Sequence, residues 1–145
     1  ELYRKEPALH ELDDSPQGFA WLNCISADDC YLTFVRNSKD EADFFVVVAN
    51  FSGAEQTIRT GVPYEGKYKE IFNTDDECFG GTGVTNSRIK RAEPVRWDGK
   101  EQSISVKMAP LSLSILRFVP YTEEELGKVI AERIRKITPI KKLKK

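Results

Sequence analysis

Apolar and polar residues alternate along most of the chain, which is the period of β-strands with one buried face. Residues 31–36 alternate in this way, whereas residues 44–49 are continuously apolar, as in a central strand covered on both faces. Further strands are predicted at 56–60, 67–72, 94–97, 102–108 and 113–119. Asp98-Gly99 is the strongest two-residue hairpin signal. The pattern predicts an all-β fold, an antiparallel β-sandwich of about seven or eight short strands.

The two ends of the chain depart from this period of two. Near the N-terminus, Leu2, Tyr3, Leu9 and Leu12 have helical spacing that Pro7 interrupts, and residues 19–25 form a short apolar segment expected to be buried. Beyond the last strand, Thr122 and Glu125 are spaced as a capping box. A helix is expected to follow, with an apolar stripe packed on the sandwich, formed by Leu126, Val129, Ile130, Ile134 and Ile137. Pro139 is expected to end this helix before a basic, frayed tail.

These patterns divide the chain into three parts. Residues 1–18 are predicted as a helical segment and linker, residues 19–120 as the sandwich, and residues 121–145 as the amphipathic helix and basic tail. The length of 145 residues suits one domain. Neither the start of the chain nor any apolar run resembles a signal peptide or a membrane span.

Composition narrows the classes of function. A net charge of −1 provides no field that would attract nucleic acid or an anionic membrane, so neither is expected as a partner. The three cysteines, Cys24, Cys30 and Cys78, lack metal-site spacing and are expected to be reduced thiols in a cytoplasmic protein. His10 is the only histidine, and no nucleophile motif accompanies it. No catalytic, metal or cofactor site is therefore expected.

Paired carboxylates occur three times, at Asp13-Asp14, Asp28-Asp29 and Asp75-Asp76. All three pairs lie in turn-like sequences, where Asp accepts hydrogen bonds from nearby backbone N–H groups, so capping is the expected role. Aromatic residues offer a different chemistry, because sugar rings stack on exposed aromatic faces. The candidates for sugar contact are Trp21, Tyr64, Tyr68 and Trp97. Packing within the sandwich is the alternative role for each of them.

Residues 72–83 carry an acidic turn that runs into a glycine loop, Phe-Asn-Thr-Asp-Asp-Glu-Cys-Phe-Gly-Gly-Thr-Gly. The loop has no lysine and precedes no helical pattern, so it is a poor phosphate-binding loop. Glycine permits positive φ or close backbone approach, which predicts a strained loop or a contact with a neighbouring domain. The segment resembles a signature of the C-terminal β-domain of bacterial 1,4-α-glucan (glycogen) branching enzymes, in the α-amylase superfamily.

Other segments resemble the same family in the same order. They are residues 2–13, Gly18-Phe19-Ala20-Trp21-Leu22, residues 46–51, residues 61–68, Asn86, Trp97-Asp98-Gly99 and residues 108–112. The first is similar to the segment that leaves the last helix of the family's (β/α)₈ barrel, and together they cover about residues 1–120. Ala20 stands where the family has an acidic residue, and the residues after Val119 extend beyond the resemblance.

The resemblance implies a parent enzyme of glycogen biosynthesis that cuts α-1,4-glucan and transfers the piece to a 6-hydroxyl. It implies a retaining double displacement with an Asp nucleophile and a Glu acid/base on the barrel, neither of which maps onto this chain. No metal or organic cofactor is implied. This chain is then expected to be a non-catalytic accessory domain that packs against the barrel, stabilises it and contacts α-glucan weakly.

The surface that would face the barrel is predicted from the apolar run and the glycine loop. The predicted barrel-facing residues are Phe44, Val46, Val48, Asp75, Phe79, Gly80 and Gly81. The sequence does not decide what packs on the second face of residues 44–49. The alternatives are the barrel, the C-terminal helix and a second copy of the chain. Two other functions also stay open: an autonomous α-glucan-binding module, and a structural domain that self-associates through the barrel-facing surface or the C-terminal helix.

Overall fold

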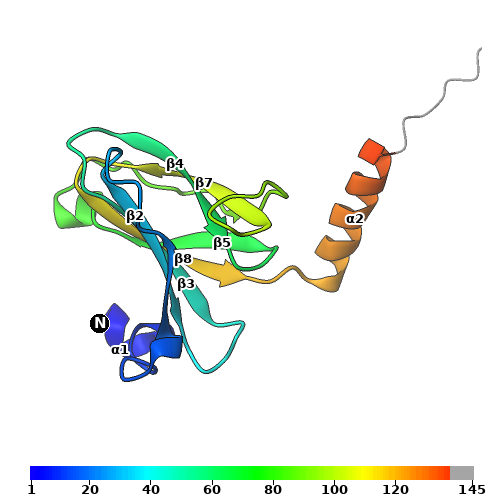
Figure 1. Ribbon diagram of the computed structural model, residues 1–145, viewed down its shortest axis with the longest axis horizontal. Coiled ribbons are helices and arrows are strands. Elements are labelled where there is room, and N and C mark those ends of the chain that lie inside the picture. The colour runs from blue at the N-terminus through cyan, green and yellow to red at the C-terminus, as the bar shows by residue number, and fades with distance from the viewer. Residues whose placement is uncertain (138–145) are drawn as a thin grey trace, which may run out of the picture.

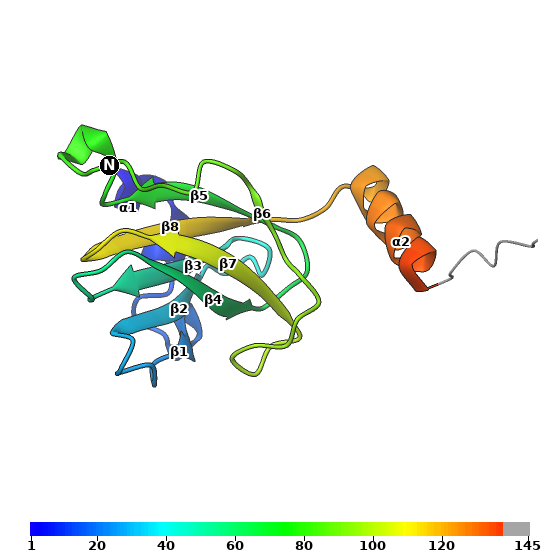
Figure 2. The ribbon, with the colours of Figure 1, turned by 90° about the horizontal axis from the view of Figure 1, so that it is seen from above.

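The computed structural model describes residues 1–137, in which eight strands form two antiparallel sheets packed face to face (Figures 1 and 2). The strands are β1 (Phe19–Asn23), β2 (Tyr31–Asn37), β3 (Phe44–Asn50), β4 (Gln56–Val62), β5 (Lys67–Asn73), β6 (Lys90–Arg91), β7 (Gln102–Met108) and β8 (Ser112–Val119). The larger sheet has the order β1-β2-β3-β8-β5-β6, and β4 pairs with β7 in the smaller one. The predicted antiparallel β-sandwich is confirmed.

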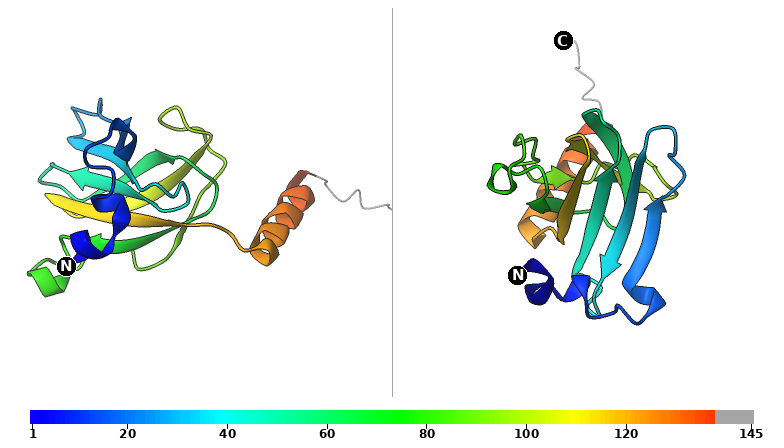
Figure 3. Two further views of the ribbon diagram at one scale, coloured as in Figure 1. Left: turned by 90° about the horizontal axis from the view of Figure 1, so that it is seen from below. Right: turned by 90° about the vertical axis from the view of Figure 1, so that its left-hand side faces the viewer.

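Helical elements lie at both ends of the described chain and in the loop between β5 and β6. They are α1 (Leu2–Lys5), α2 (Glu123–Ile137) and three short 3₁₀ helices, Pro7–Leu9, Pro16–Gly18 and Glu77–Phe79. As expected, Pro7 ends one helical turn and begins another. Figure 3 (left) shows the N-terminal segment, residues 1–18, crossing the larger sheet on the side away from β4 and β7.

One predicted strand and one predicted burial need correction. Residues 94–97 do not form a strand: Trp97 and Glu93 make only isolated bridges, to Lys100 and Ser103. The Asp98-Gly99 turn itself forms as predicted, with positive φ at both residues and reciprocal backbone hydrogen bonds between Trp97 and Lys100. The apolar segment 19–25 was expected to be buried, but residues 19–23 form edge strand β1 and Ile25 is largely exposed.

The main core lies between the two sheets. Phe44, Val46 and Val48 project into it from β3 and are almost fully buried. Their partners come mainly from β4, β7 and β8, and include Ile58, Val62, Ile104, Val106, Met108, Leu116 and Phe118. The prediction that Phe44, Val46 and Val48 face the barrel is therefore wrong. Side chains alternate along a strand, so the outward positions are those between them.

The outward residues of β3, Phe45 and Val47, are covered by the chain's own N-terminal segment. Ala8 of that segment is fully buried against them, with Leu2 and Leu9 packed around it. The outer cover of β3 is thus an element that the sequence interpretation did not consider, in place of the barrel, the C-terminal helix or a second copy.

Two arginines on the outer face of the larger sheet anchor the N-terminal segment. Arg36 donates to the Leu9 carbonyl at 3.1 Å and forms an ion pair with Asp13, and Arg117 forms one with Glu6. The Tyr3 hydroxyl donates to Asp13 at 2.7 Å. Charge-assisted contacts therefore surround the apolar contact made by Ala8.

Helix α2 stands away from the sandwich at the end of a short extended link (Figure 1). None of its residues is buried, so the expectation that its apolar stripe packs on the sandwich is wrong. Two ion pairs join it to the body: Glu125 to Lys67 at 2.8 Å and Arg133 to Glu65 at 2.6 Å. Pro139 and the basic tail lie outside the described residues. No helix within residues 1–137 is long and apolar enough to cross a membrane.

The start of α2 carries the predicted capping box. The Thr122 hydroxyl accepts from the Glu125 N–H at 3.2 Å, and the Glu125 carboxylate accepts from the Thr122 N–H at 3.0 Å. The hydrogen bond from Lys67, followed by that from the Thr122 N–H, lowers the pKa of Glu125 from 4.5 to about 2. Ionised Glu125 therefore joins the helix cap to the body of the domain.

We expect α2 to lose part of its stability in acid. Because the folded pKa of Glu125 lies below its ordinary value, ionised Glu125 stabilises the folded helix fully above pH 4.5 and progressively less toward pH 2. Far-ultraviolet circular dichroism of the protein and of Glu125→Gln should therefore differ at neutral pH and converge in that window. Parallel pH profiles for the two proteins would contradict this assignment.

Candidate interface and sugar-contact sites

An apolar row crosses the outer face of the larger sheet. The strand registers place Trp21 opposite Phe34, Phe34 opposite Val47, and Val47 opposite Ile115. Ile115 in turn lies opposite Phe72 on β5. These five residues, from β1, β2, β3, β8 and β5, are called the outer row below. Cross-strand neighbours on one face pack against each other, so the row is a continuous line of apolar contacts whose centre, at Val47 and Ile115, is buried.

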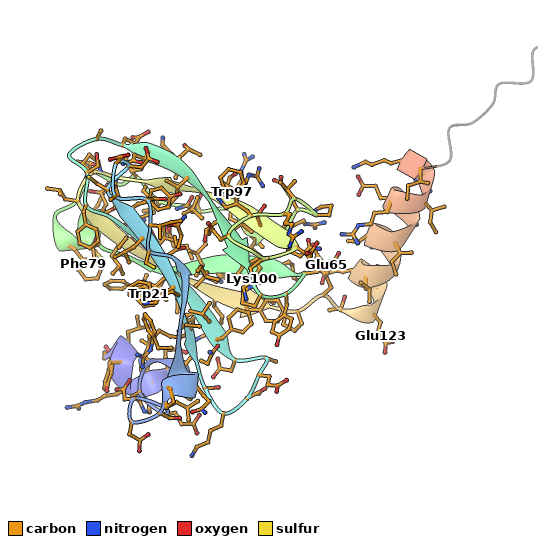
Figure 4. The ribbon with its side chains drawn as sticks, in the orientation of Figure 1. Trp21, Glu65, Phe79, Trp97, Lys100 and Glu123 are labelled. Carbon is orange, nitrogen blue, oxygen red and sulfur yellow. The ribbon has the colours of Figure 1, made fainter. Side chains whose placement is uncertain are left out.

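Both ends of the outer row reach solvent. Trp21 is 52 % exposed, although its ring packs edge-on against Phe19 and Phe34. At the other end, Phe79 is 62 % exposed and its ring centroid lies 5.4 Å from that of Phe72. In Figure 4, Trp21 and Phe79 lie on the side of the molecule toward α1. Only these two ends are largely exposed, because Val47 and Ile115 at the centre of the row are buried in the cluster that contains Ala8.

The glycine loop holds Phe79 in place. Asp75 accepts hydrogen bonds from the Thr82 hydroxyl at 2.7 Å and the Val84 N–H at 2.9 Å. These bonds, led by that from the Thr82 hydroxyl, lower the pKa of the Asp75 carboxyl. A side chain on Gly81 would collide with the Asp75 backbone, and Gly80 has a φ of +82°. The glycines therefore serve both of the expected purposes, close approach and positive φ.

Asp76 caps the short 3₁₀ helix that contains Phe79. Its carboxylate accepts from the Cys78 N–H at 3.0 Å, and this bond is the main reason that the pKa of Asp76 is lowered. Both carboxylates of the Asp75-Asp76 pair thus organise backbone N–H groups, as predicted.

A separate hollow of about 270 Å³ brings two of the predicted sugar-contact residues together. Trp21 and Tyr64, from β1 and from the loop after β4, both line it, and Tyr64 is 49 % exposed. Asn37, Glu41 and Lys100 also line it. These polar side chains supply hydrogen-bond donors and acceptors in the same hollow, whereas the Trp21 ring itself packs on Phe19 and Phe34.

The other two predicted sugar-contact residues do not join this hollow. Tyr68 is fully buried in the main core, so it is corrected to a packing residue. Its hydroxyl donates to the Tyr64 carbonyl at 2.8 Å, and burial raises the pKa of the phenol. Trp97 is 43 % exposed but does not line the hollow, and it lies toward the β4–β7 layer in Figure 4.

The sequence interpretation missed Asn37, Glu41 and Lys100 at the hollow and Phe34 and Phe72 in the outer row. The strand pattern contains a signal for Phe34 and Phe72, since each occupies an alternate position on a predicted strand. Asn37, Glu41 and Lys100 lie in or beside loops, and only the fold brings loops that are distant in sequence together.

Acid/base chemistry has little support at this hollow. Glu41 is the only carboxylate among the residues that line it, whereas glycoside cleavage generally uses a pair of carboxyl groups. Within residues 1–137, no three His, Cys, Asp or Glu side chains are grouped to hold a metal ion. The arrangement is suited to contact with a partner surface and with a neutral, hydroxyl-rich ligand.

The fold and these surfaces define an all-β sandwich domain with an apolar outer face. The chain belongs to the family described as "Alpha amylase, C-terminal all-beta domain", whose family model matches residues 21–119. The match ends with the last residue of β8, so α2 lies outside it. The resemblance noted in the sequence is thereby confirmed at the level of the family.

Curated relatives carry the name "1,4-alpha-glucan branching enzyme GlgB". The chain is 41 % identical over 117 residues to the protein from Paramagnetospirillum magneticum and 40 % identical over 117 residues to that from Rubrobacter xylanophilus. It is 37 % identical over 118 residues to the protein from Aquifex aeolicus. These matches cover 80–81 % of this chain but only 16–19 % of the relatives, so the chain spans less than a fifth of their length.

Proposed function

We propose that this chain is the non-catalytic C-terminal accessory domain of a glycogen-forming 1,4-α-glucan branching enzyme. Its role is to dock on the catalytic barrel and stabilise it, and the outer row with Phe79 is the docking surface. In this proposal Phe79 makes the contact with the barrel, and Asp75, Gly80 and Gly81 hold the loop that carries it. The parent enzyme cuts α-1,4-glucan and forms α-1,6 branches.

The observation that carries this proposal is the outer row, whose two ends are open to solvent on a domain related to branching enzymes. The N-terminal segment packs on the same outer face, so the chain that would lead from the barrel arrives beside the proposed interface. The division at 1–18, 19–120 and 121–145 is part of the same proposal. Free, exposed Cys24, Cys30 and Cys78 suit a reducing compartment, in agreement with a cytoplasmic protein.

A reconstitution experiment tests the docking surface. The Paramagnetospirillum magneticum enzyme, truncated to remove the residues matched by this chain, is mixed with the chain, and binding is measured by isothermal titration calorimetry. We expect saturable binding and a higher melting temperature of the truncated enzyme. Replacing Trp21 and Phe79 by serine should weaken binding at least tenfold, because buried aromatic residues dominate interface energies.

The matched control replaces two exposed apolar residues outside the outer row, Ile89→Ser and Val95→Ser. This variant should bind like the unchanged chain. Equal weakening by both pairs of substitutions would contradict the assignment of the interface. In a parallel assay, the chain alone should add no debranching-sensitive linkages to amylose; their formation would refute the non-catalytic role.

A second function is favoured by the hollow that contains both Trp21 and Tyr64. There, an α-glucan chain would lie against the half-exposed Tyr64 ring, while Asn37, Glu41 and Lys100 contact its hydroxyls. Trp21 belongs both to this hollow and to the outer row, so bound glucan would lie beside the docked barrel. The domain would then hold substrate weakly in addition to supporting the barrel.

Titration with maltoheptaose tests this glucan contact. We expect weak, saturable binding that Tyr64→Ala reduces several-fold, whereas Trp97→Phe, a substitution outside the hollow, leaves it unchanged. Phe79→Ser should affect docking on the barrel but not sugar binding, which separates the two functions. Absence of binding at millimolar sugar, or equal losses at Tyr64 and Trp97, would refute the contact.

A further inference from the structure

The apolar stripe of helix α2 is uncovered. Leu126, Ile130, Ile134 and Ile137 lie within an arc of about 80° on an ideal helix, because successive residues are separated by about 100°. Their exposed fractions are 42, 48, 57 and 79 %. The exposure rises toward the end of the helix that lies farther from the sandwich in Figure 1. Four large aliphatic side chains in one row are unusual on an isolated surface.

Polar contacts orient this stripe. Both Glu125 oxygens accept from Lys67 Nζ at 2.8 Å, and the Arg133 guanidinium donates to both Glu65 oxygens, at 2.6 and 3.2 Å. Glu65 lies at the end of the sandwich nearest α2, as Figure 4 shows. Glu125 and Arg133 occupy one flank of the stripe. The helix is therefore held to the body along that flank, and its aliphatic row remains open.

Packing of the apolar stripe on another surface would stabilise helix α2, because the sandwich buries none of its residues. A helix of about 15 residues is marginal in water on its own, and most helices in proteins are stabilised by packing of an apolar face. Helix α2 has 15 residues, none of them buried, and includes Gly127. Three glutamates in its first turn disfavour an anionic lipid surface as the cover.

The charge distribution of α2 matches that of a second, oppositely directed copy. Its first turn contains Glu123, Glu124 and Glu125, and its last turn contains Arg135 and Lys136. In an antiparallel pair, twofold symmetry would place each acidic end beside the basic end of the other helix. A parallel pair would instead bring like charges together at both ends.

We propose that α2 is a self-association element, which pairs with α2 of a second copy of this chain in the antiparallel direction. The aliphatic rows then face each other, with Leu126 near Ile137 of the partner subunit and Ile130 near Ile134 of the partner subunit. An interface made by one helix from each subunit falls at the weak end of protein interfaces, which bury less than about 1,200 Å² in total. The dimer is accordingly a reversible one that forms at micromolar or higher concentration.

Analytical ultracentrifugation of the 145-residue chain, over a concentration series from micromolar to millimolar, tests the dimer. We expect a reversible monomer–dimer equilibrium that Ile130→Ser with Ile134→Ser weakens at least tenfold. The melting temperature of the sandwich should not change, since neither residue belongs to its hydrophobic clusters. The matched control, Lys128→Ser with Glu132→Ser, alters the far side of the helix without changing the net charge, and should dimerise normally.

The outcomes of this experiment separate the possible surfaces. A monomer at every concentration would overturn the proposal. A dimer that persists in Ile130→Ser with Ile134→Ser would also overturn it, because the pairing surface would then lie elsewhere, as on the outer row.

Disulfide trapping tests the direction of pairing, and it does not depend on removing the central stripe residues. In chains whose native cysteines are replaced by serine, Leu126→Cys and Ile137→Cys are introduced separately, and the two variants are mixed under mild oxidation. An antiparallel pair should give the mixed disulfide well above the half expected at random. Predominance of either homodisulfide, or a random mixture, would overturn the antiparallel arrangement.

Discussion

Phe44→Ala is expected to lower the free energy of unfolding by about 3–5 kcal/mol, the usual cost of removing a fully packed phenylalanine. Phe44 is almost completely buried, and its ring stacks on Phe118 with centroids 4.8 Å apart. Tyr64 and Tyr68 pack against the same ring at 5.7 and 6.3 Å. The cavity left by alanine would be bounded by three aromatic rings on different segments, which limits its collapse.

Urea denaturation followed by intrinsic fluorescence measures this loss. The midpoint should fall while the slope of free energy against urea stays constant, because the native fold is retained. Phe51→Ala makes the same chemical change at a position that is 62 % exposed and should cost less than about 1 kcal/mol. Equal losses for the two variants would contradict the placement of Phe44 between the sheets.

Ala8→Asp should also be strongly destabilising, by about 3 kcal/mol, because it places a carboxylate in an apolar contact. Ala8 is fully buried against Phe45, Val47 and Ile115. The N-terminal segment must then either bury an unpaired charge or leave the sheet. If the segment leaves, the outer face of β3 is exposed, and the variant should also aggregate more readily.

The measurement compares urea midpoints and light scattering of Ala8→Asp with those of Ala27→Asp, the same change in an exposed loop. Ala27→Asp should behave like the unchanged protein. A stable, monodisperse Ala8→Asp protein would show that the segment is not needed to cover β3. If Ala8→Asp aggregates without a lower urea midpoint, the segment does not contribute to the free energy of unfolding. It would still shield the outer face of β3 from other molecules.

The N-terminal segment and the outer row share the outer face of the larger sheet. The segment covers the centre of the outer face at Phe45, where Arg36 and Arg117 hold it in place. The ends of the outer row, at Trp21 and Phe79, stay open on either side. The domain thus has a core of its own and keeps exposed aromatic side chains on its outer face.

Local features of the sequence predicted local structure well. The two-residue turn at Asp98-Gly99 and the capping box of Thr122 with Glu125 both formed as expected. The roles of Asp75 and of the glycines in the 80–83 loop were also foreseen. Each depends on groups within about ten residues, so the interacting partners are close enough in sequence to be recognised by spacing.

By itself, the sequence determined most of the strands, the antiparallel sandwich and the family, because side-chain alternation and turn residues are local properties. Only the tertiary structure decided that Phe44 rather than Phe45 faces the main core, since either face of a uniformly apolar strand satisfies the same pattern. It likewise placed Trp21 and Tyr64 at the same hollow, and it left the apolar stripe of α2 exposed. These outcomes depend on which distant surfaces meet, and hydrophobic burial is non-directional, so a periodic pattern does not specify its partner.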